Sequence, residues 1–223
     1  MKKVFATLTA GALLVASASA QLNLVVTEVM SNSSHGGGPS NGDWWELYNN
    51  GSSAVDLDGY IWNDSNDPTA DHSIFPSFTL SVGSAVVIVD ENSGNIDDFV
   101  SDWGGGFDAI SKSDFTGDDD FSGLGSSGDS IYLYNPSGTL LTEVTFGSMA
   151  SPNDGKSFAW DTAGNAIAGY SVAGVDGAFI AISDDGVAPG TDVGSPGITV
   201  PEPNAFAALA GILTFAFCLT RRR

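Results

Sequence analysis

Short runs of apolar and β-branched residues, separated by clusters of Gly, Asn, Asp and Ser, recur along most of this 223-residue chain. Apolar and polar positions alternate within many of these runs, and no stretch has a convincing helical period, which is the pattern of half-buried strands. The expected strands cover residues 24–30, 44–49, 59–63, 77–80, 85–89, 130–134 and 141–146, with further candidates at 157–160, 167–172 and 179–182. Seven or more short strands at this spacing predict an all-β fold, a β-sandwich.

The same alternation predicts which side chains face the core. Trp45 and Leu47 flank Glu46, and the following segments repeat the pattern. Because successive side chains of a strand point to opposite faces, one set is expected in the core. That set is Trp45, Leu47, Val55, Leu57, Tyr60 and Trp62. Glu46 is unusual in such a run, and we expect it to hydrogen-bond a neighbouring turn rather than to act in catalysis.

The N-terminal end has the pattern of a sorting segment. Lys2 and Lys3 precede an apolar stretch over residues 4–16, and small residues follow at positions 18–20. This order is typical of a secretory signal peptide, with cleavage expected between Ala20 and Gln21. Residues 1–20 are therefore left out of the predicted domain, which spans 21–200.

The C-terminal end has three parts: Pro201-Glu202-Pro203, an apolar run over 205–219, and Arg221-Arg222-Arg223. The arginines are expected to stay in the cytoplasm while the domain lies outside. As a helix, the run of 15 residues covers about 22 Å, less than the roughly 30 Å of hydrocarbon in a bilayer. The layout resembles the PEP-CTERM sorting signal over 201–223, which implies transient retention in the inner membrane, cleavage by an exosortase-type enzyme and delivery to the cell surface or extracellular matrix. A tail anchor or an ordinary C-terminal span is the alternative.

Charge and cysteine content restrict the possible partners. Between residues 21 and 200 only Lys112 and Lys156 are basic, against 26 of the chain's 27 acidic residues, so the formal charge of this region is −24. A surface this negative repels phosphate backbones, and we expect no nucleic-acid partner. Salt or divalent cations would relieve the self-repulsion. The single cysteine, Cys218, lies in the C-terminal apolar run, so no disulfide is expected in the exported domain.

Several blocks of sequence, taken in order, carry a family resemblance. They are LVVTEVM at 24–30, WELYN at 45–49, VDLDGY at 55–60 and LGSSGDSIYLYN at 124–135. Together they resemble a bacterial lamin tail domain, over about residues 22–197. The resemblance implies an immunoglobulin-like β-sandwich. The chain departs from the family pattern over residues 91–128, where an acidic and aromatic stretch lengthens one connection like an insertion.

The catalytic motifs in the chain overlap in a way that argues against an enzyme. His35-Gly36-Gly37-Gly38 matches an esterase oxyanion loop, and residues 38–42 match a nucleophile elbow around Ser40. The elbow needs a helix after it, yet a predicted strand follows here, so a flexible loop explains these residues better. His72 is the only other histidine, and neither histidine is paired with a serine by any sequence signal. We therefore predict no catalytic residue and no resident cofactor.

An acidic cluster within residues 91–128 is the best metal candidate. Asp118, Asp119 and Asp120 are consecutive, with Asp114 and Asp129 nearby. Oxygen ligands gathered in a loop are what Ca²⁺ prefers, although the spacing differs from the EF-hand loop. The alternative is a solvated acidic loop without a metal.

The aromatic residues of the same stretch suggest a second binding feature. Five of them lie in the segment: Phe99, Trp103, Phe107, Phe115 and Phe121. They would either form a stacking surface for a glycan, with 103–107 as the binding loop, or cover one open end of the sandwich. The favoured function is a non-enzymatic exported surface or matrix protein that makes structural or adhesive contacts. A calcium-dependent glycan-binding or exopolysaccharide-binding module is the alternative, and a hydrolase acting through Ser40 is less favoured.

Overall fold

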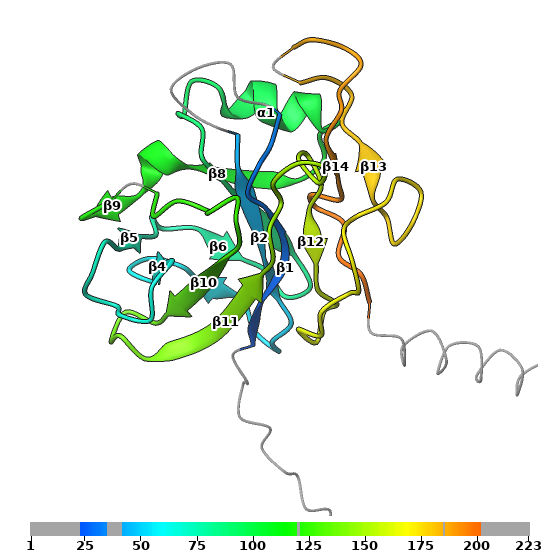
Figure 1. Ribbon diagram of the computed structural model, residues 1–223. Coiled ribbons are helices and arrows are strands. Elements are labelled where there is room, and N and C mark those ends of the chain that lie inside the picture. Colours follow the sequence, from blue (N-terminus) through cyan, green and yellow to red (C-terminus); the bar gives the residue numbers. More distant parts are fainter. Residues whose placement is uncertain (1–22, 35–41, 120, 185, 202–223) are drawn as a thin grey trace, which may run out of the picture.

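The computed structural model describes residues 23–34, 42–119, 121–184 and 186–201, and it contains two five-stranded sheets packed face to face (Figure 1). The first sheet has the order β12-β1-β2-β7-β8. Its strands are β12 (Phe158–Ala159), β1 (Leu24–Met30), β2 (Trp44–Asn49), β7 (Ala85–Val89) and β8 (Asp108–Ser111). Neighbours are antiparallel except β7 and β8, which run parallel.

The second sheet has the order β11-β10-β4-β5-β9 and is antiparallel throughout. Its strands are β11 (Leu140–Phe146), β10 (Asp129–Tyr134), β4 (Ile61–Asn63), β5 (Ser73–Ile74) and β9 (Thr116–Gly117). Two small sheets complete the fold, one of β3 (Val55–Asp56) with β6 (Thr79–Leu80) and one of β13 (Phe179–Ile180) with β14 (Val193–Gly194). The prediction of an immunoglobulin-like β-sandwich is confirmed.

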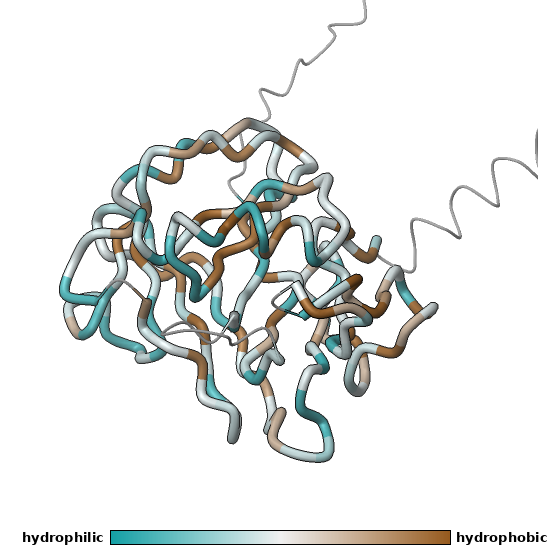
Figure 2. Tube along the Cα trace, turned by 90° about the horizontal axis from the view of Figure 1, so that it is seen from above, coloured by the Kyte–Doolittle hydropathy of each residue, from teal (hydrophilic) through white to brown (hydrophobic). Residues whose placement is uncertain are grey.

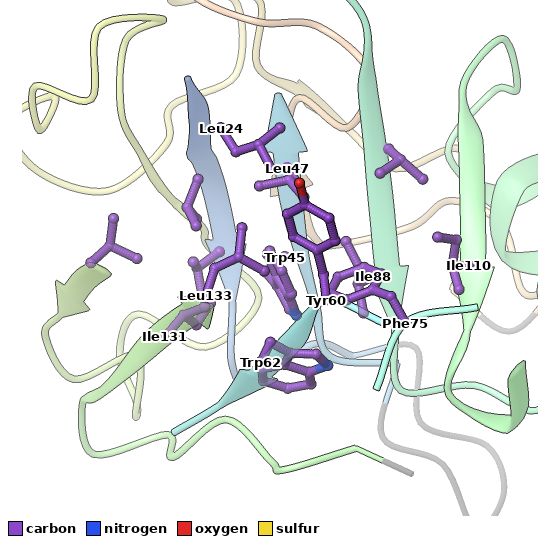
Figure 3. Close-up of a cluster of buried hydrophobic side chains, with 14 of the residues drawn as sticks. Leu24, Trp45, Leu47, Tyr60, Trp62, Phe75, Ile88, Ile110, Ile131 and Leu133 are labelled. Atoms are coloured by element: carbon purple, nitrogen blue, oxygen red, sulfur yellow. The ribbon is translucent and has the colours of Figure 1, made fainter. Parts of the chain in front are cut away.

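The main core lies between the two sheets and contains all six side chains that the alternation assigned to it. Trp45 from β2 and Trp62 from β4 meet there, with ring centroids 5.2 Å apart (Figure 3). Phe75 packs edge-on against Trp45 at 6.1 Å. Aromatic pairs of this kind contribute packing beyond their buried area. Seen from above, the apolar segments gather inside the molecule and the polar ones occupy peripheral loops (Figure 2).

A second apolar cluster covers the opposite face of the first sheet. Trp44 and Met30 point to this face, where Trp103, at the C-terminal end of helix α1 (Ile96–Asp102), and Ala181 pack over them. The Trp44 and Trp103 rings lie 5.6 Å apart at 77°. All seven residues of β1 are buried as a result. Simple alternation would expose one face of these strands to water, yet the polar residues Thr27, Glu28 and Glu46 of β1 and β2 are buried.

Three predicted strands, at 24–30, 44–49 and 85–89, agree with the structure residue for residue. The expectation of no helix was wrong: residues 96–102 form α1, and apolar residues at 96, 99, 100 and 103 have the spacing of one helix face. No strand covers 167–172, whereas β3, β5, β8, β9 and β14 were missed. Four of these five have only two residues, too few for a periodic signal.

The last part of the described chain lies against the first sheet. In β12, Ala159 pairs with Glu28 of β1, and a parallel bridge joins Lys156 to Val193. Within the described residues, no helix is long and apolar enough to cross a membrane. The predicted signal segment 1–20 and the predicted helix 205–219 lie outside the described residues.

Candidate functional site

Two buried carboxylates, Glu28 and Glu46, face each other across strands β1 and β2. They are paired in register, directly after a β-bulge that interrupts the ladder between Val26 and Glu28. Val29, which follows Glu28, and Trp45 and Leu47, which flank Glu46, belong to the core between the sheets. Because strand side chains alternate, the two carboxylates lie on the opposite face. Glu28 is 1 % exposed and Glu46 is 0 % exposed.

Glu28 is bound by two serines from the C-terminal part of the chain. Its Oε1 accepts hydrogen bonds from Ser157 Oγ at 2.5 Å and from the Ser195 amide at 2.9 Å. Its Oε2 accepts a hydrogen bond from Ser195 Oγ at 2.7 Å. Gly194 fits closely here, since a Cβ at that position would lie 3.1 Å from Glu28 Oε1 and 3.0 Å from the Trp44 ring. The carboxylate therefore joins residues from opposite ends of the described chain.

Glu46, on the neighbouring strand β2, also connects the sheet to the C-terminal part of the described chain. Its Oε1 accepts a hydrogen bond from Thr27 Oγ1 at 2.6 Å, and its Oε2 accepts one from the Gly197 amide at 2.5 Å. Gly197 lies in a turn closed by a hydrogen bond from the Ile198 amide to the Ser195 carbonyl. The predicted role of Glu46, hydrogen bonding to a neighbouring turn, is confirmed.

The environment of Glu28 and Glu46 favours the protonated form of their carboxyl groups. Burial, followed by the like charge of Glu46, raises the pKa of Glu28 to about 8 against the opposing hydrogen bonds from Ser157 and Ser195. Burial raises the pKa of Glu46 to about 7, against the hydrogen bonds from Thr27 and Gly197. Taking charge out of water is costly, so the pair holds at least one proton at neutral pH. The pair is thus a proton-binding connection between the sheet and the C-terminal segment.

A polar cavity lies at the end of the first sheet where β1 ends and β2 begins. Its volume is about 490 Å³, and residues 31–34, Asp43, Leu124 and Ser126 line it. The antiparallel pairing places the end of β1, the start of β2 and the end of β7 at this edge. The loop that precedes β10 contributes the opposite wall.

Asp43 is the buried ionisable group of this cavity. It is 7 % exposed, and its Oδ1 accepts a hydrogen bond from the Ser33 amide at 2.9 Å. Burial, together with the charges of Asp90 and Asp192, raises the pKa of Asp43 to about 7. Asp192 binds the same loop by accepting hydrogen bonds from Ser33 Oγ at 2.7 Å and from the Ser34 amide.

Comparison with known protein families matches residues 17–148 to the Lamin Tail Domain family. The chain belongs to the lamin tail domain family. The match spans strands β1 to β11, including the buried glutamates, and ends before β12. Searches among curated proteins and among solved structures found no match. The lamin tail domain is an immunoglobulin-like interaction module, and the two-sheet architecture of this chain agrees with that assignment.

Two of the three predicted calcium residues of this lamin tail domain, Asp118 and Asp119, have other partners in the structure. Asp118 Oδ2 lies 3.2 Å from His72 Nδ1, and Asp119 Oδ1 accepts a hydrogen bond from the Phe121 amide. Among the described residues, no group of three or more His, Cys, Asp or Glu side chains is arranged to hold a metal ion. Asp120 lies outside the described residues, so calcium binding by the three aspartates stays a prediction.

The aromatic residues of the 91–128 segment do not form a stacking platform. Phe115 and Phe121 belong to the core between the sheets, and Phe99, Trp103 and Phe107 pack in the cluster on the outer face of the first sheet. Trp103 is 1 % exposed, so no ligand can stack on it without rearrangement. This burial contradicts a stacking surface for a glycan on Trp103, whereas binding by the loop at 103–107 stays a prediction. Covering apolar surface is the role that these side chains have.

The residues of the hydrolase hypothesis fall into two groups. His35 and Ser40 lie outside the described residues. His72 pairs with Asp118, and its carbonyl accepts hydrogen bonds from the amides of Asp118 and Asp119. The sequence motifs drew attention to residues 35–42, whereas the polar cavity was missed because its lining combines residues 31–34 and 43 with residues 124 and 126, which are distant in sequence.

Proposed function

We propose that this chain is a non-enzymatic, exported surface or extracellular-matrix protein whose lamin tail domain makes structural or adhesive contacts. An exosortase-type enzyme would remove the C-terminal segment near Pro201-Glu202-Pro203, after cleavage of the signal peptide between Ala20 and Gln21. The proposed partners are that processing enzyme and an exopolysaccharide or other surface proteins.

The observation that supports this proposal is the last strand pairing among the described residues, directly before the predicted tripeptide. Val200 forms a parallel bridge with Asp161, and its carbonyl accepts a hydrogen bond from the Thr162 amide at 2.9 Å. Pro201, the next residue, is exposed and begins the sorting tripeptide. A processing enzyme would therefore reach an exposed Pro201 directly after the last paired residue of the described chain.

The polar chemistry of the described residues supports a binding rather than a catalytic role. Glu28 and Glu46 are engaged by serine, threonine and backbone donors and are closed off from solvent. General acid–base catalysis needs a group within reach of a substrate proton, which such burial prevents. The −24 charge of residues 21–200 favours cationic or cation-bridged partners over nucleic acids.

Expression of the full chain in a host with an exosortase-type system, and in the same host without that enzyme, tests the proposal. Intact-mass measurement of the surface or culture fraction should give a chain from Gln21 to near Glu202 only when the enzyme is present. Replacing the tripeptide Pro201-Glu202-Pro203 by alanines should leave the uncleaved chain in the membrane fraction. Recovery of a surface form that still carries Arg221 to Arg223 contradicts the processing part of the proposal.

The adhesive part needs a separate measurement. Retention of the recovered protein on purified exopolysaccharide and on extracted surface proteins from the same host should exceed retention of an equally acidic control protein. Equal retention of the two proteins at matched ionic strength would reduce the interaction to general charge attraction.

A further inference from the structure

The cavity at the end of the first sheet has an unsatisfied acceptor in its wall. Asp43 is more than nine-tenths buried, and the one donor that reaches it from the described residues, the Ser33 amide, occupies Oδ1. Oδ2 of Asp43 has no partner in the described part of the chain. Asp43 lines the cavity, and Oδ2 is not among the fully enclosed atoms that lack a partner, so this oxygen is open to the cavity. A ligand in the cavity would therefore contact Asp43 Oδ2.

The charge around Asp43 is negative. Asp90, on the connection after β7, and Asp192, on the segment before β14, both act on Asp43. Lys112 is a nearby cation, and its Nζ forms an ion pair with Asp90 Oδ1 at 2.7 Å. Positive charge in the cavity would therefore offset the Asp43 carboxylate in the wall and the two carboxylates that act on it, whereas an anion would be repelled.

The remaining walls offer hydrogen-bond acceptors. Residues 31, 33, 34 and 126 are serines, each with a hydroxyl and a backbone carbonyl, and residue 32 is an asparagine. A bare metal ion prefers several carboxylates, and no such group of three exists among the described residues. An ammonium group carries positive charge together with N–H donors, so it needs only one free carboxylate oxygen and nearby hydroxyls or carbonyls. The volume of about 490 Å³ lies within the range of ligand pockets.

We propose that this cavity is a binding site for a primary ammonium group, which donates a hydrogen bond to Asp43 Oδ2 and further bonds to the serine-lined wall. Amino sugars of a polysaccharide and aliphatic amines, such as lysine side chains, share this chemistry. The site goes beyond the proposed export and adhesion, since the purified chain should bind the ammonium wherever the protein is delivered.

Titration calorimetry on the purified full chain tests the site with four probes at fixed ionic strength. Glucosamine and 1,5-diaminopentane should both bind, whereas glucose and tetramethylammonium should bind at least about tenfold more weakly, because each lacks either the charge or the N–H donors. A stronger response to glucosamine than to 1,5-diaminopentane identifies an amino sugar as the source, and the reverse order identifies an aliphatic amine.

Two variants locate the site, and a third is the matched control. Asp43→Asn should weaken diaminopentane binding about tenfold or more, because the charge-assisted hydrogen bond is lost. Ser126→Leu should also weaken diaminopentane binding, because the larger side chain would occupy part of the cavity while the Asp43 carboxylate is retained. Asp58→Asn removes one exposed carboxylate outside the cavity and should change the affinity less than about twofold. Melting curves of all three report whether each variant is folded.

The pH dependence gives an independent measurement. The diaminopentane ammonium groups stay protonated from about pH 6 to about pH 8, whereas Asp43 gains a proton over this range, so affinity should fall severalfold towards the lower pH. Equal binding of glucose and glucosamine would overturn the proposal in favour of a polyol site. Equal binding of tetramethylammonium, or unchanged binding in folded Asp43→Asn, would reduce the effect to general attraction by an acidic surface. None of these outcomes depends on processing or matrix retention, so this site and the proposed function can fail separately.

Discussion

The stability of this domain should fall as the pH rises through the neutral range, because Glu28 holds a proton in the folded state. The pKa of Glu28 is raised from 4.5 to about 8, mainly by burial. Between these two values the folded state binds a proton that the unfolded state has lost, so unfolding releases a proton. The free energy of unfolding therefore decreases with rising pH in this window and levels off above about pH 8.

The magnitude follows from the size of the shift. At about 1.4 kcal/mol per pKa unit, Glu28 alone accounts for a loss on the order of 5 kcal/mol across the window, which is an upper limit. Glu46, whose pKa rises to about 7, acts in the same direction but is coupled to Glu28, so the two effects do not simply add. For a domain of this size, about 4 kcal/mol corresponds to a melting temperature lower by roughly 8–15 °C.

Thermal unfolding followed by circular dichroism, from about pH 5 to about pH 9 at constant ionic strength, measures this effect. Glu28→Gln should lower the dependence of the melting temperature on pH, because the glutamine cannot ionise while its amide oxygen still accepts from Ser195. Glu143→Gln is the matched control: Glu143 is exposed in β11, so the same substitution there removes a surface carboxylate and leaves the buried acid in place. If wild type and Glu28→Gln have the same slope, Glu28 is ionised in the folded protein and the argument from burial is wrong.

Two further predictions concern the core and the acidic loop. Trp45→Ala should lower the free energy of unfolding by about 3–5 kcal/mol in urea titrations, because Trp45 is 0 % exposed and packs against Trp62; an unchanged midpoint would mean that this side chain is not in the core. If Asp118, Asp119 and Asp120 bind Ca²⁺, millimolar calcium should raise the melting temperature more than magnesium or sodium at matched ionic strength, and the triple Asp→Asn variant should lose that difference. Equal responses to all three salts would leave only screening of an acidic surface.

The parts of the fold that were predicted correctly are those with a strong local signal. Strands β1, β2 and β7 combine β-branched and aromatic residues with clear turn chemistry at their ends, and their boundaries were exact. The short strands were missed because two residues carry no period. Helix α1 was missed for a different reason: its apolar residues at 96, 99, 100 and 103 have helical spacing, but only seven residues are helical, among Gly, Asp and Ser typical of loops.

The polar sites were harder to predict, because they depend on contacts between distant segments. Glu46 was recognised as unusual from its place between Trp45 and Leu47. Glu28 gave no comparable signal, since its partners Ser157 and Ser195 are 129 and 167 residues away. The lining of the polar cavity is equally dispersed, with residues 31–34 at one wall and Ser126 at another. The consecutive aspartates at 118–120 drew attention instead, although an acidic run without a folded context is most often solvated.

The C-terminal part of the chain changes the environment of the two buried carboxyl groups in the lamin tail sheet. The family match ends at residue 148, yet the donors that reach Glu28 and Glu46 from outside the sheet, Ser157, Ser195 and Gly197, all come later. These later residues bury the two carboxylates, and burial gives them their raised pKa values. The same contacts hold the chain that leads to Val200, immediately before the predicted sorting tripeptide. Because burial by this segment raises both pKa values, ionising the pair should oppose its attachment to the sheet, while the hydrogen bonds from Ser195 and Gly197 act in the opposite direction.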